Sequence, residues 1–272
     1  MSGKLYVVGT PIGNLEDLSP RAARILCEVD FIAAEDTRVT LKLLNHLGIK
    51  KPMISYFEHN KFERGAVIIE KLLSGQSGAI VTDAGMPAIS DPGEDLVREA
   101  WENGISVESV PGPAAVTTAL SVSGMKTGRF TFEGFLPQES KERKDRLAEL
   151  SRETRTMVFY EAPHRLLKTL TELKSALGNR NIAVCKELTK LHESVIRSDI
   201  DGVVAHFTAN APKGEYVLVV EGGEAKADKN AEDAVSLAKE FMKDGMSASA
   251  AARHAAAITG QKKNEIYKAI IS

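Results

Sequence analysis

Short apolar runs recur through the first half of the chain, with the length and composition of buried strands. They occupy residues 5–8, 31–34, 53–56 and 79–81, and a further strand is expected at 106–110. Between these runs the apolar residues follow helical spacing, as they do at Val67, Ile68, Leu72 and Leu73. Strands that alternate with helices predict a mostly parallel sheet with helices on its faces.

A second alternating series begins after residues 123–128, whose small and polar side chains interrupt the apolar pattern. Its helices are expected at residues 141–150 and 166–177. Its expected strands are residues 129–133, 156–160, 182–185 and 216–220, with an extra antiparallel strand at 194–198. The pattern therefore predicts two α/β domains, at residues 1–124 and 125–224.

The last part of the chain has a helical pattern and follows a polar linker that begins at Gly222-Gly223. An amphipathic helix is expected at residues 231–243. Ser247 can cap a helix at 248–257, Gly260 can end it, and a final helix covers 263–271. Residues 231–272 thus predict a small appendage of the helix-turn-helix type.

Charge excludes a strongly basic nucleic-acid-binding protein, because 35 Lys and Arg oppose 37 Asp and Glu. Any RNA contact must therefore use a local basic patch.

Cys27 and Cys185 lie in or beside apolar runs, without metal-ligand spacing, and are expected to be reduced core thiols. No signal-peptide core and no run of about 18 apolar residues occurs, so we expect a cytoplasmic protein without a membrane partner.

Three loops at strand ends mix Gly with Pro: residues 9–14, 83–93 and 111–113. Any one of them could simply form a turn. In a parallel sheet, however, the three would converge at one edge, where ligands bind. The loops lack a phosphate-loop or dinucleotide fingerprint, and the sequence has no metal-ligand cluster and no serine-hydrolase motif, so no metal is expected.

Seven motifs stand out along the chain, at residues 9–14, 35–38, 81–93, 110–113, 159–165, 186–193 and 214–216. Together they resemble the tetrapyrrole methylase superfamily. Within it, they are similar to a branch that 2′-O-methylates a cytidine in the decoding centre of small-subunit (16S) ribosomal RNA. The tetrapyrrole-specific members usually have Gly-Asp-Pro where this chain has Gly85-Met86-Pro87, which argues against a corrin or porphyrin substrate.

The resemblance implies two α/β/α domains with S-adenosylmethionine in the cleft between them, a helical appendage and a homodimer. Small and apolar residues in the loops suit that cofactor, because its adenine and sulfonium need close backbone approach and apolar walls. The positions that fall where relatives contact the cofactor are Pro11, Ile12, Gly85, Met86, Pro87, Ile89, Ala114, Ala115, Glu161, Glu215 and Tyr216.

Methyl transfer to a ribose hydroxyl needs a group that takes up the hydroxyl proton. Asp36 or Glu187 could accept it, while Arg38 and Lys186 could bind phosphate or stabilise the oxyanion. Glu35 is a further candidate. Each could instead form a structural ion pair. Two other acidic residues, Asp83 and Asp91, are expected to accept hydrogen bonds from backbone amides of their own loop.

RNA binding is expected at the tail, where Arg253, Lys262, Lys263 and Lys268 flank the tight turn. His164 and Arg165 of the motif at 159–165 are further candidates for RNA contact. The tail could instead be a dimer-stabilising helical hairpin. The mixed charges of residues 141–146 are expected to form a solvated, self-paired helix face.

Two alternative functions stay open at this point. One is a small-molecule, tetrapyrrole-like methyltransferase, which would give the tail no purpose. The other is a non-catalytic RNA-binding assembly protein, which the intact loops disfavour. The leading hypothesis is an S-adenosylmethionine-dependent methyltransferase that acts on 16S ribosomal RNA of the small ribosomal subunit.

Overall fold

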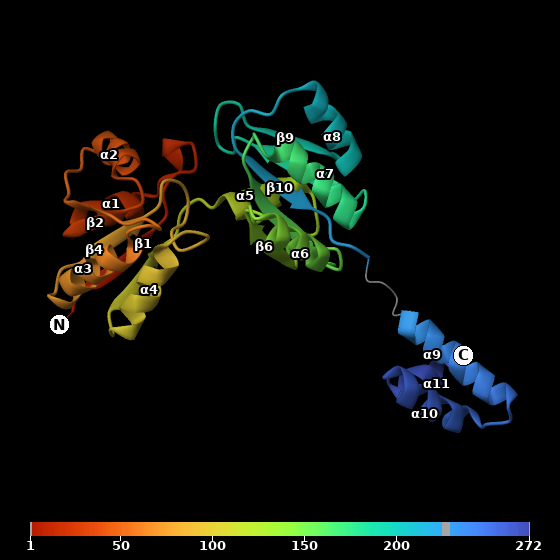
Figure 1. Ribbon diagram of the computed structural model, residues 1–272. Helices are drawn as coiled ribbons and strands as arrows, with labels where there is room; N and C mark the ends of the chain where they lie inside the picture. Colours follow the sequence, from red (N-terminus) through yellow and green to blue (C-terminus); the bar gives the residue numbers. More distant parts are fainter. Residues whose placement is uncertain (1, 225–228, 272) are drawn as a thin grey trace. The chain divides into compact units, whose positions relative to one another are not determined.

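The computed structural model describes residues 2–224 and 229–271. The chain divides into two compact units, Met1–Gly223 and Glu224–Ser272 (Figure 1). The first unit contains two five-stranded sheets, and the second is helical. The predicted α/β fold class with a helical appendage is confirmed.

The first sheet is entirely parallel, in the order β3-β2-β4-β1-β5. Its strands are β1 (Lys4–Val8), β2 (Phe31–Ala34), β3 (Met53–Ser55), β4 (Gly78–Val81) and β5 (Ser106–Val110). The connecting segments are η1 (Leu15–Asp17), α1 (Pro20–Glu28), α2 (Thr37–His46), α3 (Lys61–Leu73) and α4 (Gly93–Glu102). The mostly parallel sheet predicted from the alternating pattern is confirmed.

Helices cover both faces of this sheet, so the first half is a three-layer sandwich. On one face, Ile68 of α3 and Leu96 of α4 are fully buried with Leu5. On the other face, Leu26 of α1 and Leu44 of α2 pack with residues that include Ile32. Strands whose side chains are buried on both faces need continuous apolar runs, and β2 and β4 are buried at every position.

The second sheet is mixed, in the order β6-β7-β10-β8-β9, and only β6 and β7 are parallel neighbours. The extra antiparallel strand expected at 194–198 is confirmed as β9. The pattern did not reveal that β10 runs antiparallel to both of its neighbours. The strands are β6 (Phe130–Gly134), β7 (Thr156–Glu161), β8 (Asn181–Lys186), β9 (Ser194–Asp199) and β10 (Tyr216–Val220).

One face of the second sheet is covered by α6 (Ser140–Leu150), α7 (Leu166–Leu177) and α8 (Ile200–Ala209). Helix α5 (Ala115–Ser123) packs on the other face, where Ala119 and Leu120 are buried with Cys185. A helix that follows β5 of the first sheet in sequence therefore completes the layers of the second.

The two cysteines differ in their surroundings. Cys185 is buried in β8, and burial raises the pKa of its thiol to about 12. Cys27 is exposed, so its expected place in the core is wrong. It lies on α1, which turns Ile25 and Leu26 toward the sheet and Cys27 to the outside.

The second unit consists of α9 (Lys229–Lys243), α10 (Ala248–Thr259) and α11 (Lys263–Ile271). Its core is built mainly of alanines, which let the helix backbones approach closely, and Ile266 of α11 is buried with them. Ser247 caps α10 through a bond from the Ala250 N–H, and Gly260 ends the helix at φ +75°. None of the described helices has both the length and the apolarity needed to cross a bilayer.

Candidate functional site

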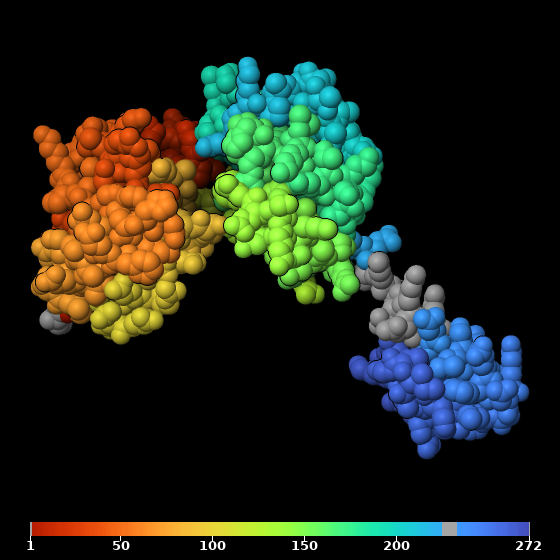
Figure 2. Space-filling model, viewed as in Figure 1, coloured from red at the N-terminus to blue at the C-terminus, as the bar shows by residue number. Residues whose placement is uncertain are grey.

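A cavity of about 520 Å³ lies in the first unit, where strand-end loops of both sheets face each other. Figure 2 shows the two halves of this unit, coloured from red to yellow and from green to cyan. Loops of both halves form the walls of the cavity. The volume is in the range of small-molecule sites. The first half contributes Ile12, Glu35, residues 82–86 and 89–91; α5 and its start contribute 114–116; the second half contributes Phe135, 160–163, Cys185, Leu188 and 215–217.

The loops after β1, β4 and β5 are joined to one another by backbone contacts. Thr10 and Gly85 exchange two hydrogen bonds, of 2.9 and 3.2 Å between nitrogen and oxygen. Gly9 donates to the Val110 carbonyl at 3.0 Å, and a Cβ added at Gly9 would lie 2.7 Å from the Gly112 backbone. Only glycine permits this approach, so the three loops form one continuous wall.

The loop after β4 is held in an unusual backbone conformation by Asp91. Its Oδ1 accepts hydrogen bonds from Ala88 N at 3.0 Å and Gly93 N at 2.7 Å. Ala88 and Ser90 have φ of 63° and 67°, a region that residues with a side chain rarely adopt. The predicted bracing role of Asp91 is confirmed, and burial raises the pKa of its carboxyl.

Asp83 braces a different loop from the one expected. Its Oδ1 accepts from the backbone N–H of Asp36 at 3.0 Å, beyond the end of β2. In return, Glu35 Oε2 accepts from the Thr82 hydroxyl and from the Asp83 N–H at 3.4 Å. The two loops thereby satisfy each other's backbone amides.

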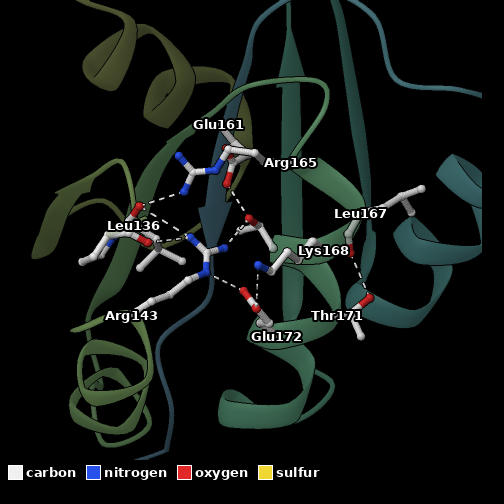
Figure 3. A network of polar contacts seen from close by, with 10 residues as sticks. Leu136, Arg143, Glu161, Arg165, Leu167, Lys168, Thr171 and Glu172 are labelled. Carbon is white, nitrogen blue, oxygen red and sulfur yellow. Dashed lines mark hydrogen bonds and ion pairs between the residues drawn. The ribbon is translucent and has the colours of Figure 1, made fainter. Parts of the chain in front are cut away.

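Glu161 belongs to a network of polar contacts that joins the end of β7 to α6 and α7 (Figure 3). Glu161 ends β7, lines the cavity and is only 3% exposed. Its Oε2 accepts from the hydroxyl of Thr169, and its Oε1 accepts from Ala162 N at 2.8 Å. Arg165 Nε lies 3.5 Å from the same Oε1. The carboxylate is thus held from behind at the edge of the cavity.

Arg143 of α6 completes the network. Its Nη2 donates to the Thr169 Oγ1 at 2.6 Å, and its Nε donates to Glu172 Oε2 at 2.6 Å. A guanidinium has donors only, so the Thr169 hydroxyl must accept from Arg143 and point its own hydrogen at Glu161. Arg143 is 5% exposed, so the charged face expected at residues 141–146 is wrong at this position. The sequence does contain a clue to this burial. Arg143 lies four residues before Leu147 and seven before Leu150, the spacing of residues on the buried face of one helix.

Most of the residues predicted to bind the cofactor line this one cavity. Pro11 instead lines a neighbouring cavity, described below. Pro87 is buried and lines neither of the two cavities. Those in the large cavity are Ile12, Gly85, Met86, Ile89, Ala114, Ala115, Glu161, Glu215 and Tyr216.

Of the five predicted catalytic residues, only Glu35 lines the cavity. Asp36 caps α2 and accepts hydrogen bonds from the Arg38 side chain, which lowers the pKa of its carboxyl to about 2. Glu187 accepts from Glu215 N at 2.8 Å and from the Lys190 ammonium; the backbone bond is the main cause of its lowered pKa. Lys186 ends β8, outside both cavity linings.

The residues predicted to contact RNA differ in exposure. His164 is exposed, but the Arg165 side chain is 19% exposed and donates to the Leu136 carbonyl at 2.8 Å. In the second unit, Arg253 on α10 and Lys262, Lys263 and Lys268 at α11 are all exposed. The structure therefore places Arg165 mainly in the network around Glu161.

The neighbouring cavity, which we call the second cavity, has a volume of about 380 Å³. The lysine Lys190 borders it, and its side chain packs against Gly13 of the β1 loop. The second cavity is lined by Thr10, Pro11, Ile12, Gly13, Leu15, Val39, Thr40, Lys42, Leu43, Thr82, Asp83, Ala84, Lys190 and Glu215. Ile12, Thr82, Asp83, Ala84 and Glu215 line both cavities.

Solved structures share the fold of the first unit at low sequence identity. The methyltransferase CobJ superposes with a TM-score of 0.61 at 16% identity, over 82% of this chain and 95% of CobJ. Uroporphyrin-III C-methyltransferase from Thermus thermophilus, solved with S-adenosylhomocysteine, gives 0.57 at 18% identity, over 82% of this chain and 98% of that one.

Sequence comparison is more specific. Ribosomal RNA small subunit methyltransferase I of Synechocystis is 45% identical over 98% of this chain and 96% of its own length. The Thermotoga maritima protein of the same name is 49% identical over 82% of this chain and 100% of its own length. Residues 4–203 match the family of tetrapyrrole (corrin/porphyrin) methylases, and residues 228–272 match the RsmI C-terminal HTH domain. The chain therefore belongs to the tetrapyrrole methylase family, together with the members named ribosomal RNA small subunit methyltransferase I.

Proposed function

We propose that this protein transfers the methyl group of S-adenosylmethionine to the ribose 2′-hydroxyl of a cytidine in 16S ribosomal RNA. The observation that carries the proposal is the large cavity between the strand-end loops, in a chain whose relatives are named ribosomal RNA methyltransferases. Intact loops on both sides of the cavity favour an enzyme over a non-catalytic binding protein.

The walls of the large cavity fit S-adenosylmethionine. Ile12, Met86 and Ala114 offer an apolar surface for the adenine and the methionine chain. Gly85, at φ +92°, brings backbone close to the ligand without a side chain. The Glu161 carboxylate supplies an acceptor for an ammonium or hydroxyl group of the cofactor.

The bound cofactor supplies a methyl group on a positively charged sulfur, which is already activated for transfer. The protein must then hold the acceptor hydroxyl in line, exclude water and take up the proton. The interlocked loops after β1, β4 and β5 provide a rigid wall for this alignment. Met86 stands where tetrapyrrole-specific members usually have an aspartate, and the loss of that carboxylate argues against a corrin or porphyrin acceptor.

The whole chain has a net charge of −2, so it has no overall attraction for RNA. RNA contact must therefore come from local groups of exposed cations. The second unit offers Arg253, Lys262, Lys263 and Lys268, and the first offers His164.

We also propose that the protein is a homodimer in the cytoplasm. The proposal of a homodimer rests on the resemblance to the methylase branch, which implies one. The mass of the purified protein in solution tests it.

The test of the function is transfer of label from radioactive S-adenosylmethionine. Small ribosomal subunits, naked 16S RNA and a porphyrinogen are offered separately. Label in the RNA of either ribosomal substrate, on a ribose oxygen of a cytidine, supports the proposal. Label in the porphyrinogen, or in none of the three, contradicts it.

A further inference from the structure

We propose that the second cavity receives the acceptor nucleoside and that Asp83, which borders both cavities, takes the proton from its 2′-hydroxyl. This inference rests on the proposed function and adds to it an acceptor site and a general base. A reacting hydroxyl must meet the donor methyl group where the two ligands adjoin. The shared wall, which includes Thr82, Asp83 and Ala84, is that place.

Two carboxylates line both cavities, Asp83 and Glu215. Glu215 is a poor candidate because its Oε2 is paired with the Lys190 ammonium at 2.8 Å. Asp83 has one oxygen committed, since Oδ1 accepts the Asp36 N–H. The described residues supply no hydrogen bond to its Oδ2. One oxygen therefore fixes the carboxylate and the other can accept a proton.

The surroundings of Asp83 make its carboxylate more basic than an ordinary aspartate, because they raise its pKa. Burial is the main cause of its raised pKa, and the nearby carboxylates of Glu35 and Asp36 raise it further. The Asp36 backbone N–H and the Arg38 guanidinium act in the opposite direction and are weaker than the sum of the others. Asp36, one of the two proton acceptors suggested by the sequence, has a pKa of about 2 and is a much weaker proton acceptor.

The second cavity has the chemistry of a nucleotide site. Leu15, Val39 and Leu43 give apolar surface for a base, and the ammonium group of Lys42 can face a phosphate. The Lys190 ammonium at the edge of the cavity is already paired with Glu187 and Glu215. Sequence-specific RNA recognition commonly uses bases that are unstacked from their neighbours and inserted into protein pockets. A single unstacked nucleoside is therefore the acceptor that this cavity fits.

The reaction balances without a further reactant. A bond forms between the ribose oxygen and the methyl carbon while the carbon–sulfur bond breaks. The electron pair of the broken bond stays on sulfur, which becomes neutral. The proton of the hydroxyl passes to Asp83 Oδ2 and then to solvent.

The first test is Asp83→Asn, which keeps the Oδ1 acceptor for the Asp36 N–H but removes the base. We expect the single-turnover methylation rate to fall about 100-fold or more, with the dissociation constant for S-adenosylmethionine unchanged. The wild-type rate should rise with pH through the pKa of Asp83 and then level off, and the variant should lose this step. The control is Asp145→Asn, an exposed aspartate on α6.

The second test fills the second cavity with Val39→Trp. Its matched control is Leu41→Trp, because Leu41 is an exposed apolar residue on the same helix that does not line either cavity. Val39→Trp should raise KM for RNA about tenfold, a cost of about 1.4 kcal/mol, and leave cofactor affinity intact. The control should keep both values.

Two outcomes overturn the inference while leaving the proposed function in place. One is RNA methylation by Asp83→Asn at the wild-type rate and with the wild-type pH profile. The other is equal KM for RNA in the two tryptophan variants. If the wild-type protein itself labels no 16S RNA, the proposed function fails, and that result is separate from either variant comparison.

Discussion

The hydroxyl of Thr169 donates its hydrogen to the carboxylate of Glu161, which lines the large cavity, and Thr169 itself is buried behind the cavity wall. The direction of this bond is fixed because Arg143 donates to the same hydroxyl oxygen. A buried charge is tolerated only when it is paired and hydrogen-bonded. The cavity carboxylate therefore depends on an arginine that does not line the cavity.

Replacing Thr169 by Val should weaken both folding and cofactor binding. The change removes the acceptor of Arg143 and the donor to Glu161, and a buried group left unsatisfied costs about 1–3 kcal/mol. Thr169→Ser keeps the hydroxyl and is the matched control. Denaturant unfolding and calorimetric titration with S-adenosylmethionine measure the two effects. Equal cofactor affinity in the valine and serine variants would show that the network does not position Glu161.

Gly9→Ala should damage the wall formed by the β1, β4 and β5 loops. The new Cβ would lie 2.7 Å from the Gly112 backbone, so the loops must separate. Overpacking of this kind costs about 1–3 kcal/mol, and cofactor affinity should fall with it. The control is Gly128→Ala, where a Cβ meets nothing within 4 Å and φ is not positive. Thermal unfolding and cofactor titration check the pair; unchanged affinity in Gly9→Ala contradicts the role of the close approach.

The apolar runs located strands such as β2, β4 and β10 because a strand buried on both faces needs a continuous run. They did not give the direction of β10, since Tyr216–Val220 is buried at all five positions and would look the same in either direction. They also did not show that α5 packs on the second sheet. An apolar helix face identifies no partner, and the pairing is decided by contacts far apart in sequence.

The sequence predicts those parts of the site that are formed by loops of unusual composition. It does not predict the parts that depend on contacts between residues far apart in the chain. The Gly and Pro loops pointed to the cavity. Arg143, by contrast, lies in a run of mixed charges, and its partners Thr169 and Glu172 are 26 and 29 residues away. Sequence alone also favoured Asp36 over Asp83, because only the fold shows that Arg38 binds the first and that the second borders both cavities.

The Asp36 and Arg38 pair should make stability depend on pH in acid. The lowered pKa means that folding favours the ionised carboxyl, so the stabilisation is complete above the ordinary aspartate pKa of 3.8. It is lost as pH falls from that value through about 2. Asp36→Asn keeps a capping oxygen but not the charge. Its stability deficit in urea unfolding should be present at neutral pH, shrink as pH falls from 3.8 and vanish below about pH 2; a deficit that stays constant with pH would rule out the ion pair as its cause.

The cations of the second unit should contribute to RNA affinity through counterion release. Replacing Arg253, Lys262 and Lys263 together by Gln removes exposed positive charges on α10 and at the start of α11. Each lost phosphate contact with single-stranded RNA should lower the slope of log affinity against log salt by about 0.7. Lys239→Gln, which removes an exposed charge from α9 of the same unit, is the control. Binding of a 16S RNA fragment is measured at several salt concentrations. If the triple variant keeps the wild-type slope, these side chains do not touch the RNA backbone and the tail must act in another way, such as dimer formation.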